Sequence, residues 1–98
     1  MVMTGTPLMA GSDQAWSAVL ETMDKVRPVI RAVMAGAGMA TEADDVAQET
    51  VLSAVTGIER WSPASGPLVA WVTTIGKRRA IDHIRKTKRG ASMKLSPG

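Results

Sequence analysis

Apolar residues recur at intervals of three and four along most of this chain, a spacing that places them on one face of an α-helix. Ser12 is of a type that caps helix N-termini, and it precedes a first series of Trp16, Val19, Leu20 and Met23. The pattern resumes after Pro28 and stops at Gly36 and Gly38. Pro28 predicts either a kink in one helix or the start of a second helix.

A capping pattern predicts that the next helix starts at about Glu42. Thr41 is followed three residues later by Asp44, a spacing at which hydroxyl and carboxylate satisfy free backbone donors. The residues expected on its inward face are Ala47, Val51, Ala54, Val55 and Ile58. Leu52 is an apolar residue on the opposite, polar face, which holds Asp45, Gln48, Glu49, Ser53 and Thr56.

The last helix is predicted from Pro67 to about Lys88, after a connector over residues 60–66. One apolar stripe holds Leu68, Trp71, Val72 and Ile75, and Ala80, Ile81 and Ile84 point to the other side. The change falls at Gly76, so the helix either bends there or packs its two halves against different neighbours, with one half projecting. We favour the second explanation. Together the patterns predict an all-α fold, a compact bundle of three to four helices.

A length of 98 residues fits one domain with a single core and leaves little room for a deep catalytic cleft. The patterns predict a loose leader over residues 1–11, a helical domain over 12–89 and a flexible tail over 90–98. The chain has no cysteine, which excludes disulfides, thiolate metal sites and a cysteine nucleophile. Neither a membrane span nor a secretory signal is evident, so we expect a cytoplasmic protein with no membrane partner.

Charge is distributed unevenly along the chain. Residues 1–76 hold eight acidic and four basic side chains, whereas residues 77–98 hold eight basic side chains and only Asp82 as an acid. Arg78, Asp82, Arg85 and Arg89 share one helix face. This stripe either tracks the phosphates of a nucleic acid or is a solvated helix end in which Asp82 pairs with its basic neighbours.

Few residues of the chain are candidates for catalysis or for metal binding. His83 is the single histidine and has no metal-ligand spacing to another donor, so a surface or half-buried role is expected. No nucleophile set, phosphate cradle or metal motif is present, and we expect no enzyme activity, no cofactor and no metal. Trp71 fits the core. Trp61 lies in the connector, where it either anchors the loop or offers a face on which an unpaired base stacks.

Residues 43–86 read ADDVAQETVLSAVTGIERWSPASGPLVAWVTTIGKRRAIDHIRK. The ordered pieces ADDVAQET, RWSP, AWVTTIG and RRAIDHIRK resemble the second conserved region of bacterial sigma factors of the extracytoplasmic-function (ECF) group. A weaker similarity from Asp13 to Met39, with an Arg-Pro pair in mid-helix, extends the resemblance to the first helices of that domain. The resemblance thus covers most of the chain and implies a sigma region 2 bundle.

The resemblance implies one surface for a protein partner. The helix that starts near Glu42 would dock on the clamp coiled coil of the RNA polymerase β′ subunit. The implied polymerase-binding residues are Asp44, Asp45, Gln48, Glu49 and Leu52. Such a role accounts for Leu52 on a polar face, because an interface combines an apolar anchor with a charged rim.

The resemblance also implies a promoter-binding surface. The loop over residues 61–67 would capture a base flipped out of the −10 element, and the helix over residues 77–89 would contact the −10 duplex and hold the melted non-template strand. The implied DNA-binding residues are Trp61, Ser62, Pro63, Ala64, Ser65, Gly66, Lys77, Arg78, Arg79, Arg85, Lys86, Lys88 and Arg89. The chain is therefore expected to be a transcription-initiation module.

Three departures from the family pattern matter. Trp61 stands where the family commonly has Phe, Arg78 stands where a small polar residue is common, and the chain holds no Phe or Tyr. The −35-reading domain of these factors has no counterpart here, so a separated region 2 is expected. An anti-sigma factor is a further implied partner that no residue identifies. A stand-alone helix-turn-helix regulator and a polymerase-binding adaptor without DNA recognition remain alternatives.

Overall fold

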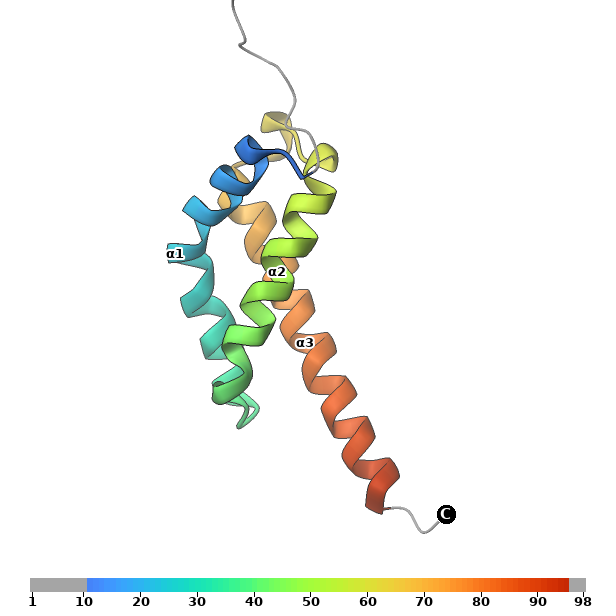
Figure 1. Cartoon of the computed structure of the whole chain (residues 1–98). Coiled ribbons are helices and arrows are strands. Elements are labelled where there is room, and N and C mark those ends of the chain that lie inside the picture. Colours follow the sequence, from blue (N-terminus) through green and yellow to red (C-terminus); the bar gives the residue numbers. More distant parts are fainter. Residues whose placement is uncertain (1–10, 96–98) are drawn as a thin grey trace, which may run out of the picture.

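The computed structural model describes residues 11–95, and the side chains of residues 11–88. In this part of the chain three α-helices, α1 (Asp13–Gly36), α2 (Ala43–Gly57) and α3 (Leu68–Leu95), run in alternating directions (Figure 1). Short 3-10 turns connect them: η1 (Ala40–Glu42), η2 (Ile58–Arg60) and η3 (Pro63–Ser65). The predicted all-α bundle is confirmed. The predicted leader, apart from Gly11, and residues 96–98 of the tail lie outside the described residues.

The first helix begins and ends where its sequence predicts. Ser12 Oγ accepts a hydrogen bond from the Ala15 N–H at 3.1 Å, which confirms the N-cap. α1 continues through Pro28, so the alternative of a second helix starting there is wrong. Beyond the end of α1, Gly38 has φ +75°, a conformation that glycine adopts without strain. This turn lets the Met39 N–H donate to the carbonyl of Met34 at 2.8 Å and reverses the chain.

α2 starts one residue later than predicted, and the predicted capping pair is wrong. The N-cap is Glu42, which makes no side-chain capping hydrogen bond, and Thr41 lies in the preceding turn η1. A 3-10 turn leads directly into the helix, so the backbone is already wound before α2 begins. The predicted inward face is correct, because Ala47, Val51, Ala54, Val55 and Ile58 are all buried.

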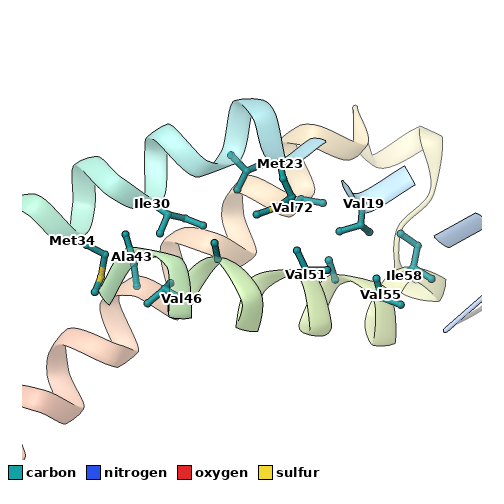
Figure 2. Packing of buried hydrophobic residues seen from close by; sticks show 14 of the residues in the cluster. Val19, Met23, Ile30, Met34, Ala43, Val46, Val51, Val55, Ile58 and Val72 are labelled. Carbon is teal, nitrogen blue, oxygen red and sulfur yellow. The ribbon is translucent and has the colours of Figure 1, made fainter. Parts of the chain in front are cut away.

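The core lies along the axis of the bundle and is built mainly by α1 and α2. Its largest fully buried apolar side chains are Ile30, Met34, Ile58, Val19, Val26, Val46, Val55 and Val72. Figure 2 shows the packing of this core from close by. α3 adds Val72 and Ala80, and Gly76 between them is also buried. A Cβ at Gly76 would lie 3.1 Å from Ile30 Cδ1, so α3 crosses α1 at close range at this residue.

α3 is one helix through Gly76 and ends at Leu95, beyond the predicted end at Lys88. Lys, Arg, Ala and Met in its last turns favour helix, and no proline occurs between Pro67 and Pro97. Its C-terminal part extends past the rest of the bundle, as predicted (Figure 1). The prediction that Ala80 and Ile84 face a different neighbour is wrong, because Ala80 is buried in the same core as Val72 and Ile84 packs partly against it. Among the described residues no helix is both long and apolar enough to cross a membrane.

Candidate functional site

The predicted polymerase-binding residues of α2 are all exposed, but they lie on two sides of the helix. Gln48 and Leu52 line a groove between α1 and α2. Glu49 lines a groove beside α3, and Asp45 is one helical turn before it. Asp44 lies one turn before Gln48, on the α1 side. The predicted polymerase-binding face of α2 is thus divided between a side next to α1 and a side next to α3.

The groove between α1 and α2, named here the α1–α2 groove, is largely apolar. Its lining residues are Trp16, Leu20, Arg27, Gln48, Val51 and Leu52. Leu20 is 51% exposed and Leu52 is 54% exposed, and they are two of the three exposed large hydrophobic residues in the described part of the chain. Leu20 was predicted on the inward face of α1. It lies at the edge of the inward face of α1. The groove therefore extends the predicted polymerase-binding surface from α2 onto α1.

A single ion pair marks the rim of the α1–α2 groove. Arg27 Nη1 lies 3.7 Å from Asp44 Oδ1, and the two side chains are 43% and 77% exposed. An exposed pair of this kind contributes less than about 1 kcal/mol to stability. Both charges therefore remain accessible to a partner.

A second groove lies between α2 and α3, on the other side of α2, and is named here the α2–α3 groove. Its volume is about 670 Å³, and its lining residues are Ser53, Thr56, Gly57, Arg60, Trp71, Ile75, Arg78, Arg79 and Asp82. Trp71 is half-buried, and Gly57 lies against its ring with no side chain to cover it. Three arginines and the indole therefore share one open groove. Arg60 and Trp71 were not among the predicted DNA-binding residues.

The basic surface continues along α3 toward its C-terminus. A smaller hollow next to the α2–α3 groove is lined by Glu49, Arg79, Asp82, His83, Arg85 and Lys86. Arg79 and Asp82 line both, so the two form one continuous track. Glu49 and Asp82 place two acids inside this otherwise basic track. Of the predicted stripe on α3, the side chain of Arg89 lies outside the described residues.

His83 joins α3 to the start of α2. Its Nε2 lies 2.7 Å from Glu42 Oε1, and the two residues are 41 positions apart in the sequence. The histidine is half-buried, as predicted, with 23% of its side chain exposed. This contact fixes the part of α3 that carries the basic track against the bundle. Among residues 11–88 no group of three metal-ligating side chains is found.

Trp61 holds the two ends of the connector between α2 and α3 together through a hydrogen bond to Gly66. Trp61 Nε1 donates a hydrogen bond to the carbonyl oxygen of Gly66 at 3.0 Å, and the hydroxyls of Ser62 and Ser65 lie 3.3 Å apart. Gly66 has φ +111°, which only glycine adopts readily. The half-buried indole of Trp61 thus braces the loop. It is Trp71, rather than Trp61, that lines the groove with the arginines.

A small helical bundle with an apolar groove on one side and a basic track on another defines a domain that binds macromolecules. The family model of sigma-70 region 2 matches residues 19–90, and the chain belongs to this family. Sigma-factor region 2 is a non-enzymatic transcription-initiation domain that in general binds RNA polymerase core and recognises the promoter −10 element. Among curated proteins and among solved structures, none matches the chain.

Proposed function

We propose that this chain is the region 2 module of an ECF-type sigma factor, with a functional domain over residues 12–89. In this proposal it docks on the β′ clamp helices of RNA polymerase and recognises and melts the −10 element, and it acts in the cytoplasm. The observation that carries the proposal is the separation of the α1–α2 groove from the α2–α3 groove. Because the two grooves lie on different sides of α2, a protein and a nucleic acid can occupy them at the same time.

The α1–α2 groove suits the polymerase. Leu20 and Leu52 expose apolar surface from two neighbouring helices, and Gln48 adds a hydrogen-bonding group beside them. The exposed charges of Arg27 and Asp44 form a polar rim. An apolar centre inside a polar rim is the usual arrangement of a protein interface, and its central side chains carry most of the binding energy.

The α2–α3 groove suits DNA. Arg60, Arg78 and Arg79 approach it from the loop and from α3, and each can neutralise a phosphate and release a condensed counterion. The exposed part of Trp71 offers an aromatic surface, on which stacking of an unpaired base contributes about 1–3 kcal/mol. Duplex bases are already stacked on one another. The arrangement therefore favours single-stranded or forked −10 DNA over duplex.

Removal of single arginines tests the DNA half of the proposal. Arg60→Ala and Arg78→Ala should each lower affinity for a forked −10 oligonucleotide and reduce the slope of log K against log salt by about 0.7–0.9 per lost phosphate contact. Arg31→Ala, an exposed arginine of α1, is the matched control and should leave both quantities unchanged. Equal, salt-independent binding to duplex and forked DNA would contradict the proposal. If instead the chain bound polymerase and no DNA, the adaptor alternative would hold.

Alanine substitutions on the two sides of α2 test whether the chain binds polymerase as proposed. In a titration with polymerase core, Leu52→Ala should weaken binding, and Gln48→Ala combined with Glu49→Ala should weaken it as well. Gln14→Ala, an exposed glutamine in the first turn of α1, serves as the control. Unchanged affinity in both variants would remove the assigned interface. The helix-turn-helix alternative loses support because residues 58–67, with two 3-10 turns, separate α2 from α3.

A further inference from the structure

The third exposed large hydrophobic residue of the described chain lies in neither groove. Ile81 is 42% exposed on α3, and its neighbour Ala80 is the residue that faces the core. Ile84, one turn later, packs partly against the core. Ile81 therefore projects from the outer side of α3, away from the helix contacts that hold the bundle together.

The surroundings of Ile81 are strongly basic. At about 100° per residue, six side chains within two turns fall within roughly 60° of Ile81 on the helix surface: Thr74, Ile84 and four cations. The cations are Lys77, Arg78, Arg85 and Lys88, and all four are exposed. An isolated apolar residue on a surface is common and by itself indicates nothing. Here the four cations determine what can cover Ile81, because a partner that buries it must tolerate or neutralise their charge.

We infer that Ile81 contacts the 5-methyl group of a thymine in the bound DNA and makes the chain prefer thymine at one position. The inference rests on the proposed function, because it requires DNA on this side of α3. A DNA strand neutralises the four cations through its phosphates, and the thymine methyl is the apolar group that a base edge presents. The contact adds sequence preference to a face whose charged residues bind any sequence.

The contact also gives the chain a chemical basis for distinguishing thymine from uracil. Replacing thymine by deoxyuridine deletes only the methyl group and leaves the base-pairing edge and the phosphates unchanged. Burial of one methyl contributes about 0.8 kcal/mol, which corresponds to an affinity ratio of about fourfold. A loss of this size from one deoxyuridine separates the apolar contact from the electrostatic contribution.

The experiment replaces each thymine of a forked −10 oligonucleotide by deoxyuridine, one at a time. The oligonucleotide is the tightest binder of a panel of single-base variants, and the full chain is titrated alone and in complex with polymerase core. At one position the replacement should weaken binding of the wild-type chain about fourfold and leave Ile81→Ala unaffected. Arg31→Ala, at an exposed residue of α1 that lies in neither groove, is the control and should keep the full deoxyuridine effect.

Two outcomes would overturn the inference, and they are distinguishable. If the chain binds forked DNA but no deoxyuridine position matters, or if the effect persists in Ile81→Ala, the contact does not exist while the proposed function stands. If the wild-type chain binds no forked DNA under either condition, the DNA half of the proposed function fails and the inference fails with it. Alanine favours helix, so Ile81→Ala should stay folded, which thermal unfolding checks.

Discussion

The close crossing of α3 and α1 at Gly76 leads to a quantitative prediction about the substitution Gly76→Ala. In an open helix this change stabilises by about 1 kcal/mol, because glycine is a poor helix former. At Gly76 the new Cβ would lie 3.1 Å from both Cδ1 and Cγ1 of Ile30 and 3.3 Å from Cγ1 of Val26. Carbon atoms in contact prefer about 3.5–4.0 Å, so the neighbours must move.

Whether Gly76→Ala stabilises or destabilises the protein depends on how far the side chains of Ile30 and Val26 can move. Ile30 is 1% exposed and Val26 is fully buried, so neither side chain can swing into solvent. Overpacking of a core costs about 1–3 kcal/mol, which exceeds the gain in helix propensity. We expect Gly76→Ala to lower the free energy of unfolding by about 1 kcal/mol, or Tm by about 4–8 °C for a domain of this size.

Urea and thermal unfolding of four variants would measure this effect. Gly36→Ala is the matched control, because nothing lies within 4 Å of its added Cβ, and it should be neutral or stabilising. Ile30→Val removes Cδ1 and by itself costs about 0.5–1.5 kcal/mol. In the double variant with Gly76→Ala the two losses should not add, since the deleted carbon is one of those that clash. Stabilisation by Gly76→Ala equal to that by Gly36→Ala would refute the reasoning.

Three further predictions concern hydrogen bonds and charges. Ser12→Ala should lower the free energy of unfolding by about 1 kcal/mol in urea, through loss of the N-cap; an unchanged midpoint would show that α1 needs no cap. Trp61→Phe removes the donor to Gly66 and should cost about 0.5–1.5 kcal/mol, while a larger loss would mean that the ring also anchors the core. Arg27→Ala, in a double-mutant cycle with Asp44→Ala, should give a coupling below about 1 kcal/mol that salt weakens; a salt-independent coupling would contradict solvent screening.

Local periodicity predicted much of the fold, because the signals that start, stop and orient a helix lie within one or two turns of each other. The Ser12 cap, the end of α1 at Gly36 and the buried series from Ala47 to Ile58 are examples. The capping pair at Thr41 and Asp44 fits the same kind of local rule and is absent, because the turn η1 takes its place. Local rules thus predict an element more reliably than its boundary.

Which residues share each groove depends on contacts between helices, and a pattern within one helix does not reveal these contacts. Sequence spacing alone placed Gln48 and Glu49 on one polar face of α2, but α1 lies beside Gln48 and α3 beside Glu49. Arg60 and Trp71 entered the basic groove only because α3 returns along α2. A helical pattern fixes the direction of each side chain about its own axis, and only the packing of the three helices decides which neighbour that side chain meets.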